Sequence, residues 1–335
     1  MIDKSQQEIM QSWGTDNADA PFVSVHCTTY NHEPYIAQAL DGFLMQKTNF
    51  PFEVIVHDDA STDRTAEIIR EYEARFPKII KPIYETENQY SKHDGSIARI
   101  MVAACKGKYI ALCEGDDYWT DEAKLQMQVD FLEGNPKYTM CFHNAIEHYE
   151  DNSHPDRLFS MIEGRDYSAK EILKRWTVPT ASVCYRKQSI ETDFYWNLKK
   201  DPRFIFGDII LFLTLCREGK IRGMNVTMSV YRRHEGGAVW GFSHERNYKH
   251  HYHLLAMKEH FPELSGVVKF VAIKKDAAWC AEALLCKEIG FAKFFFKLNI
   301  LTNIFLVPFY CVRLYKHVQK YKNDKSIKDA ERSEK

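Results

Sequence analysis

The chain has 335 residues, of which 45% are hydrophobic and 13% aromatic, enough to bury a large core in one big domain or in a domain plus an appendage. Its 45 basic and 46 acidic side chains leave a formal net charge of −1, so no overall field favours a nucleic acid or an anionic membrane as a partner. The nine cysteines are an odd number without a CxxC pair, which predicts reduced thiols in a cytoplasmic protein rather than disulfides or a zinc site.

Residues 1–20 are polar and acidic, whereas a secretory signal peptide is basic and then apolar. We therefore expect a polar N-terminal extension of a cytoplasmic protein. A regular pattern begins at residue 21 and changes at Trp240, which predicts a main domain over 21–240 with halves of about 21–145 and 146–240.

Short β-rich segments alternate with longer amphipathic segments from Phe22 onward. The strand-like runs are FVSVHC, EVIVH, KIIKPIYE, YIALC and YTMCFH, and helix-length segments such as EPYIAQALDGFLMQ and TAEIIREYEARF separate them. This alternation is typical of βαβ units, in which a mainly parallel open sheet is covered by helices on both faces. The sequence predicts a Rossmann-like α/β domain.

Polar clusters follow three of these runs: TTYNHE after FVSVHC, DDASTD after EVIVH, and EGDDYW after YIALC. In an open parallel sheet, ligands bind beyond the carboxyl ends of the strands. We expect the three clusters to face one crevice.

The third cluster places Glu114, Asp116 and Asp117 within four positions. Carboxylates at this spacing raise one another's pKa unless a cation lies among them. Mg²⁺ and Mn²⁺ prefer such oxygen ligands and commonly bind together with substrate phosphates. The pattern favours a divalent metal with a diphosphate; the alternative is that one of these aspartates, or Thr120, caps a helix that begins near Asp121.

The first cluster does not cradle phosphate as a GxxxxGK[ST] loop or a GxGxxG turn would, since neither motif follows the first strand. Tyr30 offers a ring on which a base can stack, and Thr28, Thr29 and Asn31 offer hydrogen bonds to a base or ribose. The alternative is a helix N-terminal turn served by Asn31 or Glu33.

The second half of the domain is less regular. A helix SAKEILKRW and a short strand ASVCYR are predicted within 145–206. FGDIILFLTLCREGK then predicts a helix that ends at Gly219, and MNVTMSVYRRH predicts a strand. Asp208 precedes this apolar helix, and without further information such an acid is more typical of a helix cap than of a catalytic group.

Beyond Trp240 the pattern is helical, with a predicted helical region over 241–322 and a charged flexible tail over 323–335. HERNYKHHYH lacks the spacing and acidic partner of a zinc helix and predicts an exposed helix start. The apolar stretch 298–312 has basic flanks but is shorter than the roughly 20 residues that cross a bilayer. It predicts either an interfacial helix in peripheral contact with the inner face of the cell membrane or a helix buried against the main domain.

Several of these segments resemble the family-2 glycosyltransferases with the GT-A fold. They are VSVHCTTYNHEPYI, FEVIVHDDASTDRTAEII and GKYIALCEGDDYWTDEAKLQMQ, in the family's order and spacing. GDIILFLTLCREGKIRGMNVTMSVYRRHEGG resembles the acceptor-side half of bacterial members that build surface polysaccharides. The resemblance covers 22–240 and implies a GT-A-type open, mainly parallel sheet flanked by helices, to which the helical C-terminal region is an appendage.

The resemblance also implies roles for particular residues in nucleotide binding. Thr29, Tyr30 and Glu33 would line the base and ribose pocket, and Asp58 would bond to the base. Glu114 would take the first position of the DxD motif, where the family has aspartate, and would reach the ribose or the metal.

The remaining implied roles concern the metal and the acceptor. Asp116 would bind the metal with Asp117 beside it. The stretch YRRHEGG, which follows the last predicted strand, adds Arg232 as a positive charge for the diphosphate and His234 as a further metal ligand; the alternative is a solvated basic turn. Asp208 resembles the family's general base, which takes the proton from the acceptor hydroxyl.

Together these implications describe an inverting, Mn²⁺- or Mg²⁺-dependent glycosyltransferase of cell-surface polysaccharide synthesis. It would move a sugar from a nucleotide-sugar donor, expected to be a UDP-sugar, to a saccharide or lipid-linked saccharide acceptor. One alternative is a non-catalytic nucleotide-sugar-binding or scaffold protein of the same fold. Another is a sugar nucleotidylyltransferase, which normally has a glycine-rich basic loop where this chain has CTTYNHE.

Overall fold

The computed structural model describes residues 2–14, 20–92, 94–237, 244–285 and 290. The chain divides into two compact units, residues 1–241 and 242–335. The boundary predicted at Trp240, the apolar stretch 298–312 and the charged tail 323–335 lie outside the described residues.

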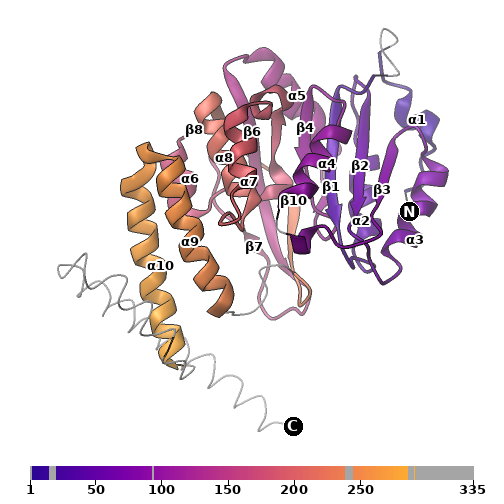
Figure 1. The fold of residues 1–335 in the computed structure, drawn as a ribbon. Coiled ribbons are helices and arrows are strands. Elements are labelled where there is room, and N and C mark those ends of the chain that lie inside the picture. The colour runs from indigo at the N-terminus through magenta and orange to yellow at the C-terminus, as the bar shows by residue number, and fades with distance from the viewer. Residues whose placement is uncertain (1, 15–19, 93, 238–243, 286–289, 291–335) are drawn as a thin grey trace. The chain divides into compact units, whose positions relative to one another are not determined.

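The first unit is built on a mixed sheet flanked by helices (Figure 1). Its strands are β1 (Val23–Thr29), β2 (Phe52–Asp58), β3 (Ile80–Tyr84), β4 (Tyr109–Leu112), β5 (Tyr118–Trp119), β6 (Tyr138–Tyr149), β7 (Arg157–Leu158), β8 (Asp166–Tyr167), β9 (Cys184–Arg186) and β10 (Lys220–Arg233). Its α-helices are α1 (Gln6–Met10), α2 (Ile36–Leu44), α3 (Thr65–Arg75), α4 (Ser96–Ala104), α5 (Lys124–Gly134), α6 (Ala169–Arg175), α7 (Asp193–Lys200) and α8 (Gly207–Glu218). Short 3-10 helices are η2 (Tyr90–Lys92), η3 (Thr180–Ser182) and η4 (Lys187–Ile190).

The strands lie in the order β3-β2-β1-β4-β9-β6-β10-β5, with β7 paired to β6 and β8 to β10. The first four strands of this path are parallel. Strand β9 runs antiparallel to β4 and β6, and β5 runs antiparallel to β10, whereas β6 and β10 are parallel. The predicted α/β fold is confirmed; the sheet is parallel where the βαβ pattern is regular and mixed beyond it.

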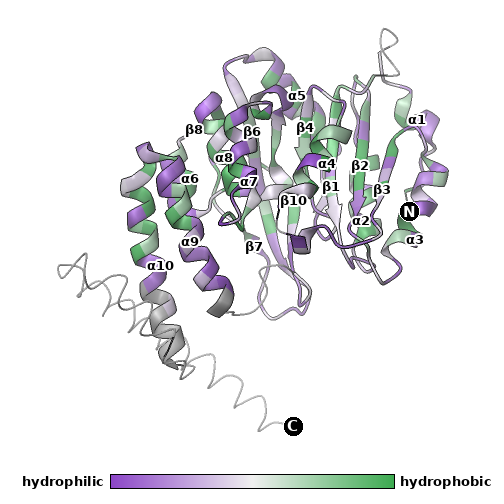
Figure 2. Ribbon diagram, viewed as in Figure 1, coloured by the Kyte–Doolittle hydropathy of each residue, from purple (hydrophilic) through white to green (hydrophobic). Residues whose placement is uncertain are grey.

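The core is densest around β1 and β2. Every residue of β2 is buried, as expected for a strand covered on both faces, and hydrophobic residues run along the central strands (Figure 2). The N-terminal extension contributes to this core, because Ile9 and Trp13 are buried in it and the Trp13 ring meets Phe52 at 5.4 Å between centroids. Part of the segment predicted as a polar extension thus packs on the sheet.

The described part of the second unit is helical, as predicted: α9 (His244–His260), η5 (Pro262–Leu264) and α10 (Ser265–Leu285). The helix start predicted for HERNYKHHYH is confirmed, since α9 begins at His244, but the predicted exposure is wrong, because His250, His251 and His253 are buried. Nδ1 of His251 lies 3.2 Å from Oδ1 of Asp276 on α10, a partner that local sequence does not reveal. Among the described residues, no helix combines the length and the apolar composition needed to span a membrane.

Candidate functional site

Three loops meet at one edge of the sheet, where β1, β2 and β4 end. The amide of Gly115 donates to the carbonyl of Thr28 at 2.9 Å, and the amide of Asp59 donates to the carbonyl of Thr29 at 3.0 Å. These bonds join the loop after β1 to the loops after β4 and β2. The three predicted polar clusters therefore do meet in space.

Gly115 allows the acidic loop to approach β1 closely. A Cβ at this position would lie 2.7 Å from Oγ1 of Thr29 and 3.1 Å from Nδ1 of His32. A side chain would therefore push the loop away from β1. The glycine between Glu114 and Asp116 sets the distance between the acidic loop and the TTYNHE loop.

The loops after β1 and β2 are tied to each other. Oδ1 of Asn31 accepts a hydrogen bond from the amide of Thr62 at 2.8 Å, and Oε2 of Glu33 accepts one from the amide of Arg64 at 3.1 Å. The Glu33 carboxylate, predicted to line the ribose pocket, thus bonds to the neighbouring loop in this structure.

The other predicted nucleotide-binding residues of these strands lie side by side. Thr29 is the register partner of Asp58. Oγ1 of Thr29 and Oδ1 of Asp58 are buried without a hydrogen-bond partner, and burial raises the pKa of Asp58. Tyr30 is 44% exposed beside them. A buried polar atom without a hydrogen-bond partner lowers the stability of the folded protein. Oγ1 of Thr29 and Oδ1 of Asp58 are therefore suited to hydrogen bonding with a ligand.

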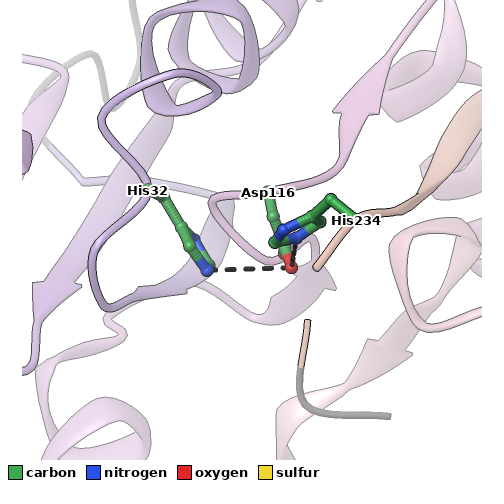
Figure 3. Close-up of side chains that lie close together, drawn as sticks. All are labelled: His32, Asp116 and His234. Carbon is green, nitrogen blue, oxygen red and sulfur yellow. Dashed lines mark hydrogen bonds and ion pairs between the residues drawn. The ribbon is translucent and has the colours of Figure 1, made fainter. Parts of the chain in front are cut away.

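His32, Asp116 and His234 form a group of potential metal ligands (Figure 3). Nε2 of His234 donates to Oδ2 of Asp116 at 3.0 Å, and Nε2 of His32 lies 3.7 Å from the same oxygen. One ligand atom from each residue lies within 4.8 Å of the others. The donor set and its spacing fit a divalent metal ion.

Burial and neighbouring charges act on the pKa of each of the three acids of the loop. Burial and the charges of Asp116 and Asp208 raise the pKa of Glu114 to about 8. Burial and the charges of Asp116 and Glu114 raise the pKa of Asp117 well above its ordinary value. Burial acts to raise the pKa of Asp116 too, but its hydrogen bond with His234 and its interaction with His32 outweigh burial and lower that pKa.

Arg232 holds the acidic loop from the end of β10. Its amide donates to Oδ1 of Asp117 at 2.9 Å, and its Nη1 donates to the carbonyl of Asp116 at 2.5 Å. Its Nε donates to Oε1 of Glu150 at 2.7 Å, and its Nη2 donates to Gln38. The Arg232 side chain is 4% exposed, so the solvated basic turn considered for it does not form. In this structure it acts as a clamp on the loop.

None of the acids of the loop caps helix α5. The helix begins at Lys124, and its capping residue, Ala123, makes no side-chain capping bond. Asp121, not Asp116 or Asp117, accepts the hydrogen bond from the amide of Ala123, at 2.8 Å. The capping alternative is therefore wrong for the two aspartates. Asp116 belongs to the metal-ligand group, and Asp117 accepts a hydrogen bond from the amide of Arg232.

Asp208 is the second residue of helix α8, and Phe206 is the capping residue. Oδ1 of Asp208 accepts a hydrogen bond from the adjacent amide of Ile209 at 2.8 Å. Burial raises the pKa of Asp208, while that amide and the nearby charge of Lys199 act to lower it. Because its charge also raises the pKa of Glu114, Asp208 lies within electrostatic reach of the acidic loop.

Sequence reasoning missed several residues of this site. His32 stands inside the TTYNHE cluster, and its position two residues after Tyr30 was a usable signal. The ring centroids of Tyr35 and His234 lie 4.6 Å apart. The positive charge of Lys199 acts to lower the pKa of Asp208, although the two residues are not adjacent in the sequence. Tyr35 and Lys199 carry no motif, so their roles depend on the fold.

Residues 24–201 match the family model of glycosyl transferase family 2. An uncharacterized protein of Mycobacterium tuberculosis is 41% identical over 218 residues, which are 65% of this chain and 60% of that protein's length. A UDP-Glc:α-D-GlcNAc-diphosphoundecaprenol β-1,3-glucosyltransferase of Escherichia coli is 26% identical over 215 residues, which are 64% of this chain and 78% of that one.

Among solved structures, the mannosyltransferase PcManGT from Pyrobaculum calidifontis, in complex with GDP-Man and Mn²⁺, shares the fold. Its TM-score is 0.50 at 14% identity, covering 93% of this chain and 91% of that one. This likeness, with the mixed sheet and its flanking helices, confirms the predicted GT-A-type fold. Because the family model matches more than half of the chain, the chain belongs to glycosyl transferase family 2.

Proposed function

We propose that this protein is an inverting, metal-dependent glycosyltransferase that moves a sugar from a UDP-sugar to a saccharide or lipid-linked saccharide in polysaccharide synthesis. The observation that carries the proposal is that the charge of Asp208, on α8, acts on Glu114 of the acidic loop, which belongs to the other half of the domain. A carboxylate suited to accept a proton thus lies within electrostatic reach of the loop suited to hold a metal and a diphosphate. A nucleotide-binding scaffold would need only the second of these.

In the proposed reaction, Asp208 takes the proton from the acceptor hydroxyl as that oxygen attacks the anomeric carbon. A single displacement from the face opposite the leaving group inverts the anomeric centre. Asp116 and His234 would hold Mn²⁺ or Mg²⁺, with Asp117 beside them, and the bound ion would supply positive charge for the departing diphosphate. Arg232 keeps the loop in place through its bonds to Asp116 and Asp117.

For the donor, Thr29 and Asp58 offer unpaired buried polar atoms to a base and ribose, with Tyr30 exposed beside them. The name of the Escherichia coli relative includes UDP-Glc, which supports a UDP-sugar. The name of the Pyrobaculum structure includes Mn²⁺, which supports a divalent metal.

For the acceptor, the same Escherichia coli name includes a diphosphoundecaprenol, which supports a lipid-linked saccharide. We place the reaction in the cytoplasm. The stretch 298–312, outside the described residues, is the candidate for contact with the inner face of the membrane.

A panel of nucleotide-sugars, measured by thermal shift on the full chain with and without Mn²⁺, tests the proposal. A ligand that binds only the folded protein raises its melting temperature, by several degrees when ligand is in large excess over its Kd. We expect UDP-sugars to do so with Mn²⁺, and Asp116→Ala to lose the metal-dependent part. If no nucleotide-sugar shifts the wild type with Mn²⁺ present, the proposal fails.

A further inference from the structure

We propose that His32 is a third protein ligand of the metal site, so that two imidazoles and one carboxylate bind a first-row transition-metal ion without nucleotide and discriminate against Mg²⁺. This inference deepens the proposed function, because it concerns the metal of the same site. The proposal rests on the positions of His32, Asp116 and His234 (Figure 3).

The spacing of the three ligand atoms is close to that of a filled site. Nitrogen and oxygen ligands about 2.1 Å from an ion lie roughly 3.0–3.4 Å apart when they are neighbours in octahedral or tetrahedral geometry. Here Oδ2 of Asp116 lies 3.0 Å from Nε2 of His234 and 3.7 Å from Nε2 of His32. The three ligand atoms all lie within 4.8 Å of one another, so the group must contract to surround one ion.

Ring contacts hold both imidazoles in this arrangement. The Tyr35 ring lies 4.6 Å from the His234 ring and 6.5 Å from the His32 ring, and the two imidazoles are 6.1 Å apart. The guanidinium of Arg232 lies 5.0 Å from the Tyr35 ring. Since Arg232 also holds the acidic loop, one residue supports both the carboxylate and the rings. A site held in this way loses little side-chain freedom on binding an ion.

The chemistry of the donors determines which ion the site takes. Mg²⁺ prefers oxygen ligands in a near-ideal octahedron and keeps several waters. Imidazole nitrogen suits the first-row transition ions better, with affinity rising from Mn²⁺ through Co²⁺. Two nitrogens out of three protein ligands therefore favour Mn²⁺ and Co²⁺ over Mg²⁺. Three protein ligands also leave coordination positions for diphosphate oxygens.

Electron paramagnetic resonance of Mn²⁺ bound to the full-length, nucleotide-free protein tests the inference. We expect one bound Mn²⁺ whose spin-echo modulation shows two imidazole nitrogens, and no displacement by an equal concentration of Mg²⁺. Modulation from a single nitrogen, or displacement by equimolar Mg²⁺, would overturn it. This readout needs neither donor nor turnover, so it is independent of the outcome of the nucleotide-sugar panel.

The variant His32→Gln provides the second arm. We expect it to lose one nitrogen from the modulation and to bind Mn²⁺ more weakly by about tenfold or more. The matched control is His251→Gln, because His251 also lies beside a carboxylate, with its Nδ1 3.2 Å from Oδ1 of Asp276, but in the second unit and outside the ligand group. Unchanged Mn²⁺ affinity in His32→Gln, with the control also unchanged, contradicts the proposal. If His32→Gln does not fold, the nitrogen count of the wild type decides.

Discussion

Lys199 places its ammonium group at the start of helix α8, where a positive charge is ordinarily unfavourable because the helix dipole is positive there. Its Nζ donates to the carbonyl of Gly207 at 3.4 Å, and a Cβ on Gly207 would lie 2.9 Å from that nitrogen. Burial lowers the pKa of Lys199 to about 8, while the charge of Asp208 acts in the opposite direction. We interpret Lys199 as the cation that favours the ionised form of the proposed base.

This interpretation predicts a pH effect for Lys199→Met. Asp208 must be ionised to accept a proton, so activity rises with pH through its pKa, which burial holds above the ordinary value. Removing the nearby positive charge raises that pKa further. We expect the acidic limb of the kcat/KM profile to move to higher pH, so that the loss of activity is largest on that limb and smaller above pH 8, where Lys199 itself loses its proton.

Two variants control this experiment. Lys199→Arg keeps the charge and should keep the acidic limb near that of the wild type, and Lys200→Met should leave the profile unchanged because Lys200 is exposed. A uniform loss of activity at all pH values in Lys199→Met, without movement of the limb, would show a structural role only.

At the residue scale, the sequence predicted those parts of the candidate site that lie in motifs. Asp116 and His234 are brought together although they are far apart in the chain, and each stands in a polar cluster that directly follows a predicted strand. The clamp made by Arg232 was not predicted, because its partners Gln38 and Glu150 come from segments without a motif. Chemistry that depends on contacts between distant segments has no local pattern to indicate it.

Strand β10 is the element that joins the two halves of the site. Successive side chains of a strand point to opposite faces of the sheet. At the end of β10, the neighbouring residues Arg232 and Arg233 therefore bond to different partners. Arg232 bonds to the acidic loop, whereas Arg233 bonds through Nε to Oε1 of Glu147 at 2.7 Å. The two neighbouring arginines therefore form a matched pair for mutation.

Arg232→Lys keeps the charge but loses the fork of donors that reaches Asp116, Glu150 and Gln38 at once. Since this side chain is buried, we expect a loss of about 2 kcal/mol or more in the free energy of unfolding, and weaker Mn²⁺ binding. The same change at Arg233, whose side chain is 26% exposed, should cost less and leave Mn²⁺ binding unchanged. Urea denaturation measures the free energy of unfolding, and Mn²⁺ titration measures metal binding. Equal losses in Arg232→Lys and Arg233→Lys would contradict the role of Arg232 in holding the acidic loop.

At the element scale, the strands with regular alternation were predictable and their pairing in the second half was not. β1 to β4 follow the βαβ pattern, in which each crossover constrains the next strand to be parallel. Strand β9 has only three residues and lies between β4 and β6, antiparallel to both. Nothing in ASVCYR specifies those neighbours, because a short buried strand pairs wherever two open edges are available.

At the scale of the whole molecule, all the predicted site residues lie in the first unit, from Thr29 to His234. The family match ends at residue 201, so Asp208, Arg232 and His234 are beyond it. The fold returns Arg232 and His234 to the edge of the sheet where the matched segment ends its strands, and the charge of Asp208 acts on Glu114 there. Asp208, the proposed base, therefore stands in a region that the family match does not cover.

Turnover of the full-length Asp208→Asn variant, with Mn²⁺ and the UDP-sugar that the thermal-shift panel selects, tests that claim most directly. Asparagine keeps the size of the side chain but cannot take a proton. We predict donor affinity within about threefold of the wild type and a fall in the transfer rate of about 10³-fold, in the range by which a positioned base accelerates a reaction. Turnover at the wild-type rate would contradict the assignment of Asp208 and the mechanism proposed from it.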